Sequence, residues 1–248
     1  MALVFESLVM GLTSVAIVLS SLLFGLICIV RGIRYRTKLL TIAGINVIFM
    51  GSYWLGPSVE IFAVMLLNVH LDPPDLYILL SYSQIPFGII FMGILAGELV
   101  MPNYKGAVLG SLTCLAFIYM AGLYTSLYMT MNEIAYFPGY IINVPPDLNH
   151  IIDGYPTPYS LCLYIAIFGD FTVLFLEAGG CLIKAYQSTG LLRRKFILLA
   201  IGFSLFVFGG LSDIVIDTET TDWGIYWLAM SRSVMCFMGI FIYLGLKT

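Results

Sequence analysis

The stretch RRKFILLAIGFSLFVFGGLSDIVI, Arg193–Ile216, decides the fold, because three basic residues lead directly into a long apolar run with one charged residue, Asp213. A bilayer core about 30 Å thick requires roughly 20 apolar residues per helix. The run is therefore predicted to cross a membrane as a helix. The whole chain of 248 residues is 60% hydrophobic and 10% charged, a composition that excludes a water-soluble domain.

Six further apolar runs of similar length follow the same pattern. Together the seven predicted spans are about Leu3–Val30, Leu39–Leu67, Leu76–Met101, Gly106–Met131, Tyr159–Ala185, Phe196–Ile216 and Ile225–Leu246. They are too long and too continuous for the alternating strands of a membrane β-barrel. We expect one domain, residues 1–248, folded as an all-α bundle of seven transmembrane helices.

Apart from Arg232, the basic residues lie in or beside alternate connections, and this predicts the orientation. They are Arg31, Arg34, Arg36 and Lys38 in the first loop, Lys105 in the third, Lys184, Arg193, Arg194 and Lys195 around the fifth, and Lys247 at the end. Under the positive-inside rule these connections are cytoplasmic. We expect the N-terminus outside, the C-terminus in the cytoplasm, and a first helix that is retained and not cleaved as a signal peptide.

The longest connection, at about Asn132–Pro158, is rich in proline and aromatic residues. A connection of this length in a compact bundle usually has a function or is disordered. We expect an ordered lid over the outer mouth of the bundle, with a simple linker as the alternative.

Ionisable residues inside the predicted spans are the main candidates for function, because each costs at least roughly 2.5 to 3.5 kcal/mol to insert. They include Glu60, Asp170, Asp213 and Arg232. Counting about 1.5 Å per residue places Glu60, Asp213 and Arg232 at similar heights, with Asp170 deeper. Asp213 is the expected partner of Arg232 and Glu60 the next choice; the pair is either a structural lock between helices or part of a binding site.

The binding hypothesis is an outward-facing polar pocket in which Arg232 holds an anion or the buried acids hold a cation. Its predicted residues are Glu60, Asp170, Asp213, Arg232, Tyr53, Trp54 and Tyr82. The aromatic members also suit an interfacial belt that anchors the protein in the membrane. Nearer the cytoplasm, Glu98 and Glu177 are expected to reach toward the basic loops. Glycine pairs such as Gly209–Gly210 predict close helix packing.

Motifs for most enzymatic chemistries are absent from the sequence. There is no HExxH, P-loop or GxSxG motif, and the last span has no lysine that could link retinal. The five cysteines show no metal-binding spacing, so we expect no cofactor; a metal site that joins His70 and His150 to nearby aspartates is an open alternative. Two segments, Phe168–Asp170 and Gly210–Asp213, resemble the aspartate pair of presenilin-like intramembrane proteases, although Ser212 replaces the final glycine of the motif.

A spaced pattern resembles the seven-helix membrane sensor region of prokaryotic histidine kinases and related signalling proteins. The matching features are the basic first loop Arg31–Lys38, Trp54-Leu55 followed by Glu60, Tyr82, Gln84 and Pro86, and the segment Tyr186–Lys195 that leads into Leu199–Gly202. Members of that family usually continue into a cytoplasmic effector domain. Here the chain ends at Thr248, so the resemblance implies a stand-alone sensor, with any effector on a separate polypeptide.

Three functions follow from these observations. We expect first a stand-alone sensor or non-catalytic membrane subunit that works in the lipid bilayer with a cytoplasmic effector, a membrane partner or further copies of itself. A transporter or channel for a small solute or ion is the second possibility, because buried acids also line permeation paths. An intramembrane aspartyl-type protease is the third. No nucleic-acid partner is expected.

Overall fold

The computed structural model describes residues 5–131, 140–143, 145, 147–156, 161–215 and 222–247. Within these residues, seven helices are long and apolar enough to cross a membrane. They are Phe5–Arg34, Lys38–Leu67, Asp75–Leu99, Pro102–Tyr128, Leu161–Gln187, Gly190–Asp213 and Trp223–Leu246. Each overlaps one predicted span, which confirms a helical, multi-pass membrane protein on the basis of length and composition.

Most spans are built from more than one helical segment. The helices are α1 (Phe5–Arg34), α2 (Lys38–Gly51), η1 (Ser52–Trp54), α3 (Leu55–Phe62), η2 (Ala63–Leu67), α4 (Asp75–Tyr82), α5 (Ile85–Leu99), η3 (Pro102–Tyr104), α6 (Lys105–Met131), α7 (Leu161–Thr172), η4 (Val173–Gly179), α8 (Gly180–Gln187), α9 (Gly190–Val215), α10 (Asp222–Met235) and α11 (Met238–Leu246). Two of these segments, η2 and η4, are π-helical. Turns of this kind occur mostly as single insertions in α-helices, frequently at functional sites.

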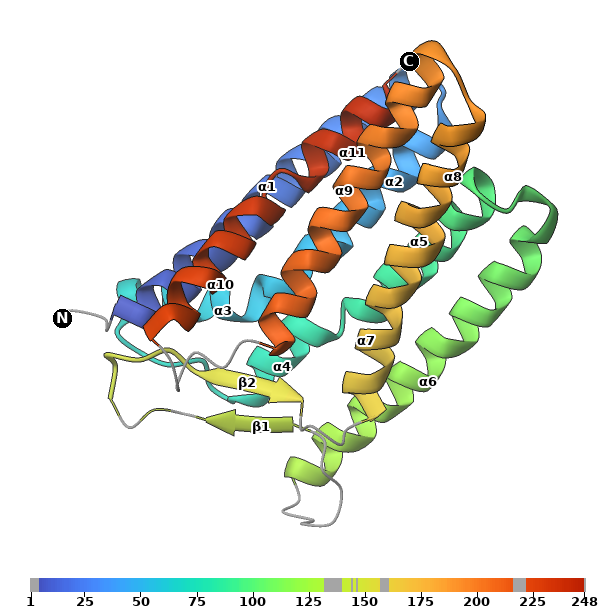
Figure 1. The fold of residues 1–248 in the computed structure, drawn as a ribbon. Coiled ribbons are helices and arrows are strands. Elements are labelled where there is room, and N and C mark those ends of the chain that lie inside the picture. Colours follow the sequence, from blue (N-terminus) through green and yellow to red (C-terminus); the bar gives the residue numbers. More distant parts are fainter. Residues whose placement is uncertain are drawn as a thin grey trace.

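The helices run alongside one another, and the two termini lie at opposite ends of the bundle (Figure 1). The turns from α1 to α2, from η3 to α6 and from α8 to α9 lie toward the end that carries the C-terminus. These are the connections with the basic residues, so the charge that sets the expected orientation is gathered at one end.

Part of the long connection forms a small antiparallel hairpin at the opposite end of the bundle (Figure 1). Its strands are β1 (Tyr140–Asn143) and β2 (Asp153–Pro156), with Tyr140 opposite Pro156 and Asn143 opposite Asp153. Ile151 and Ile152, just before β2, are buried. The described part of the connection is therefore ordered; residues 132–139, 144, 146 and 157–158 of the predicted lid lie outside the described residues.

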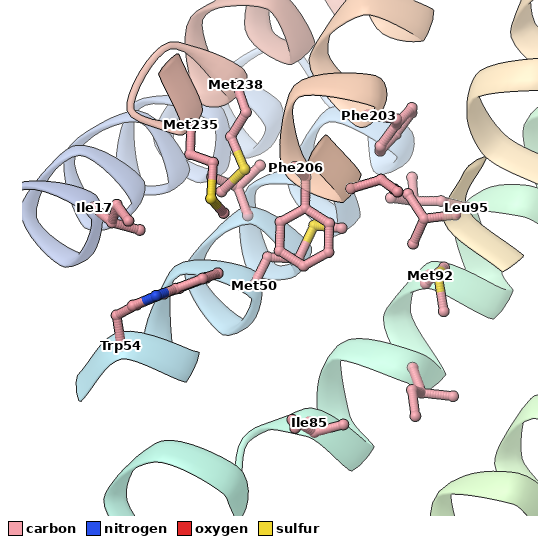
Figure 2. Close-up of a cluster of buried hydrophobic side chains, with 14 of the residues drawn as sticks. Ile17, Met50, Trp54, Ile85, Met92, Leu95, Phe203, Phe206, Met235 and Met238 are labelled. Carbon is pink, nitrogen blue, oxygen red and sulfur yellow. The ribbon is translucent and has the colours of Figure 1, made fainter. Parts of the chain in front are cut away.

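The hydrophobic core contains buried side chains from all seven spans. Figure 2 shows Ile17, Met50, Trp54, Phe206, Met235 and Met238 converging from different helices. Glycines let some of these helices approach closely. A Cβ on Gly44 of α2 would lie 2.6 Å from the backbone oxygen of Gly25 on α1. The tight contact between α1 and α2 therefore depends on the absence of side chains at both positions.

Candidate functional site

Arg232 of α10 is buried, with 6% of its surface exposed, and it binds Asp213, Met10 and Ser14. Its Nε lies 3.1 Å from Oδ1 and 3.2 Å from Oδ2 of Asp213 on α9. Its Nη1 donates to the backbone oxygen of Met10 at 3.1 Å and to Ser14 Oγ at 3.0 Å, both on α1. The predicted pairing of Arg232 with Asp213 is thus present.

Trp54 completes this arrangement. Its indole Nε1 donates to Asp213 Oδ2 at 2.6 Å. We call Met10, Ser14, Trp54, Asp213 and Arg232 the Arg232 junction; it ties α1, η1, α9 and α10 together. A buried ion pair repays its desolvation only when further hydrogen bonds satisfy both groups, and here they do. The sequence named Trp54 only as a wall or anchoring residue, and its role as a hydrogen-bond donor to Asp213 was not predicted.

Glu60 of α3 has no exposed surface and does not contact Arg232. Its Oε1 lies 2.6 Å from His70 Nδ1 and accepts the Ile152 backbone N–H at 3.2 Å. Its Oε2 accepts the Leu71 backbone N–H at 2.9 Å. We call these four residues the Glu60 clamp, because one carboxylate fastens two separate connecting segments to the helix bundle.

The clamp continues to the surface through His70. His70 Nε2 lies 3.0 Å from the backbone oxygen of Asp147, and the Asp147 carboxylate lies 2.9 Å from His150 Nδ1. The hydrogen bond with His150 holds the pKa of the exposed Asp147 carboxyl below its ordinary value. Ser7 of α1 accepts the Ile151 backbone N–H at 3.3 Å. In the described part of the chain, no three His, Cys, Asp or Glu residues are grouped so that they could hold a metal ion.

Asp170 of α7 is buried with 9% exposure, and it faces α9. A Cβ on Gly210 would lie only 3.1 Å from Asp170 Oδ2, so this glycine makes room for the carboxylate. Asp170 also interacts electrostatically with Asp213, one turn further along α9. No described residue gives Asp170 a hydrogen bond or an ion pair.

The prediction that Glu98 and Glu177 both reach toward the basic loops was wrong for Glu177. Glu98 does reach a basic residue, with its Oε1 3.3 Å from Lys105 Nζ, but Glu177 does not. It is 1% exposed, and neither carboxylate oxygen has a hydrogen-bond partner among the described residues. The spacing of seven residues from Asp170 also predicts that Glu177 shares an interior helix face with it, and the burial of both side chains agrees with that part of the prediction. Glu177 lies in the π-helical segment η4.

The predicted tyrosines occupy different surroundings. Tyr53 packs in the interior, with its ring 5.9 Å from that of Phe206 and 6.1 Å from that of Trp54. It interacts electrostatically with both Asp170 and Glu177. Tyr82, at the end of α4, is half-buried against the hydrophobic core. The interior thus contains two groups of polar residues, the satisfied Arg232 junction and the region of Tyr53, Asp170 and Glu177.

The partners of Asp213 bear on the protease hypothesis. Paired catalytic carboxylates share a proton, which requires that both be free to exchange it. Asp213 instead binds Arg232, and its Oδ2 also accepts from Trp54. The geometry therefore favours proteolysis least among the three predicted functions.

Comparisons with known proteins found no family model, no curated protein and no solved structure that matches the chain. The resemblance to seven-helix sensor regions therefore stays a prediction from the sequence pattern.

Proposed function

We propose that this chain is a seven-helix membrane sensor or non-catalytic membrane subunit, with the hairpin end outside and the basic end in the cytoplasm. The Glu60 clamp is the observation that supports this most directly. A fully buried carboxylate holds the segments at Leu71 and Ile152 to the bundle. A ligand or partner that binds the outer connection would act on this carboxylate and, through it, on the second span.

A series of contacts connects the Glu60 clamp to the sixth and seventh spans. Glu60 lies six residues after Trp54 in the same span, and Ser58 Oγ donates to the Trp54 backbone oxygen at 2.6 Å. Trp54 in turn binds Asp213, which binds Arg232. A shift of α3 would therefore change the packing of the sixth and seventh spans, whose far ends lie beside the basic turns. Such coupling requires two arrangements of the helices that a ligand binds with different affinity.

Hydrogen–deuterium exchange of the protein in lipid nanodiscs tests this proposal. The Glu60→Gln variant keeps the side-chain size but replaces one acceptor oxygen with an amide group, so one of the clamp's N–H groups loses its partner. We expect faster exchange at residues 147–152 and also at the distant turns, residues 34–38 and 187–190. Glu98→Gln is the matched control, because this exposed acid pairs with Lys105 and is not a member of the clamp. Faster exchange confined to residues 147–152 would refute coupling between the two ends.

Transport is the second candidate, and the buried acids Asp170 and Glu177 favour it. Ionisable residues in membrane spans often mark ion pathways. Proteoliposomes that contain a pH-sensitive dye would report proton flux driven by a Na⁺ or K⁺ gradient. Flux that is abolished by both Asp170→Asn and Glu177→Gln would replace the sensor proposal with a transporter, while wild-type vesicles that match empty vesicles would exclude coupled transport of these ions.

A further inference from the structure

Glu177 has a buried carboxylate without a partner in the interior of the bundle. Its side chain is 1% exposed, and both carboxylate oxygens lack a hydrogen-bond partner among the described residues. Removing an ionised carboxylate from water without a partner costs several kcal/mol or more. A membrane on the outside of the bundle removes the alternative of local hydration by bulk water. A proton or a positively charged group is therefore required to neutralise the Glu177 carboxylate.

The side chains around Glu177 do not supply a positive charge. Its electrostatic neighbours are Tyr53 and Cys181, and Tyr53 also interacts with Asp170. The single guanidinium in this part of the interior, that of Arg232, is already bound by Asp213. Asp170, the other buried acid of this span, lies seven residues before Glu177, and no described basic residue forms an ion pair with Glu177.

The helices α5, α7, α8 and α9 pack against η4. Their titratable or charged residues are Glu98 on α5, Cys162, Tyr164 and Asp170 on α7, Cys181, Lys184 and Tyr186 on α8, and Arg193, Arg194, Lys195 and Asp213 on α9. No ion pair joins any of the basic residues in this set to Glu177 in the described structure, and Arg193 and Arg194 are exposed. The neutralising charge therefore does not come from the packed helices.

We propose that the buried Glu177 carboxylate is a binding site within the membrane for a small monovalent cation, either a proton or Na⁺. A proton converts the carboxylate to a neutral carboxylic acid, with no electron transfer and no leaving group. Na⁺ would bind the same carboxylate oxygens, which are hard ligands of the kind that such ions prefer. The π-helical turn of η4 is where this carboxylate enters the interior. The proposal does not depend on signalling and holds for a sensor or a transporter.

Infrared spectroscopy of the protein in nanodiscs tests the site, because a protonated carboxyl has a carbonyl band separate from that of a carboxylate. In sodium-free choline buffer we expect this band in the wild type, a large loss of it in Glu177→Gln, and no change in Glu98→Gln. The band should decrease reversibly as the pH is raised. If it also falls when NaCl replaces choline chloride, Na⁺ competes for the site; if it is insensitive to NaCl, the site binds protons alone.

Two results would overturn the proposal. One is a protonated-carboxyl band that is equal in the wild type and Glu177→Gln, together with no stabilisation of the wild type by NaCl against thermal unfolding. The other is a Glu177 band that never changes with pH or NaCl, which would make the proton a fixed part of the fold. Asp170→Asn is the second variant: it removes the other buried acid of this span, so a band that remains in Asp170→Asn and is lost in Glu177→Gln belongs to Glu177. These measurements do not involve the Glu60 clamp, so they are independent of the coupling test above.

Discussion

Trp54 donates its indole hydrogen to Asp213 over 2.6 Å, although 159 residues separate the two in the chain. The bond joins the second span to the sixth, and Arg232 brings in the seventh through the same carboxylate. Met10 and Ser14 add the first span. One aspartate and its cation therefore hold four of the seven spans in register.

Arg232→Met is expected to destabilise the bundle, because it leaves the Asp213 carboxylate without its cation. Breaking a buried pair costs about 3 to 5 kcal/mol, and the partly exposed Asp213 side chain favours the lower end, about 3 kcal/mol. Equilibrium unfolding by SDS in mixed micelles measures the free energy of unfolding.

The double variant Asp213→Leu with Arg232→Met is the control for this prediction. It removes both charges together, so most of the lost free energy of unfolding should return. A double variant that is at least as unstable as Arg232→Met would show that the residues act through packing and not through their charges.

Trp54→Phe keeps an aromatic ring in the core but removes the N–H that binds Asp213. Hydrogen bonds to charged groups contribute about 1.5 to 3 kcal/mol, and we expect a loss in this range in the same unfolding experiment. Trp223→Phe is the matched control: Trp223 is 83% exposed, and surface substitutions usually change stability by less than about 0.5 kcal/mol. Equal losses in the two variants would contradict the assigned hydrogen bond.

The sequence was sufficient for the spans, because the thickness of a bilayer fixes the length of an apolar run. Helix ends were less predictable: α1 continues to Arg34, beyond the apolar run that ends at Val30, since long basic side chains can extend from a membrane helix to the interface. The small hairpin β1–β2 was not predicted, because its register depends on contacts with the end of the bundle.

Pairs of site residues could be predicted only where the two residues lie at the same depth in the membrane. Counting residues brought Asp213 and Arg232 to one level, and the structure joins them. The Glu60 clamp could not be found in this way, because its partners are a histidine and backbone N–H groups of connecting segments. For Glu177, the spacing from Asp170 predicted an interior helix face correctly, whereas the expected reach toward the basic loops was wrong, because the buried carboxylate has no partner among the described residues.

Gly44→Ala is expected to separate α1 from α2. The added Cβ would meet the backbone oxygen of Gly25 at 2.6 Å, and backbone atoms cannot move aside as a side chain can. Overpacking of this kind costs about 1 to 3 kcal/mol. Gly110→Ala is the control, because nothing lies within 4 Å of its Cβ position and alanine is the better helix former by about 1 kcal/mol. Opposite effects on the free energy of unfolding would support the close contact, and a stable Gly44→Ala protein would argue against it.

Asp147 gives a prediction for the effect of pH on the outer connection. Its hydrogen bond with His150 lowers the pKa of its carboxyl in the folded protein, so its contribution to stability is present above the unfolded pKa, about 3.9. That contribution is lost as the pH falls through the folded pKa. Amide protection factors of residues 148–152, corrected for intrinsic exchange rates, should therefore decrease in acid in the wild type. Asp147→Asn lacks this carboxyl, so its decrease should be smaller than that of the wild type. If Asp147→Asn loses protection over the same pH range and to the same extent as the wild type, the acid effect does not come from Asp147 and the Asp147–His150 pair adds nothing to the clamp.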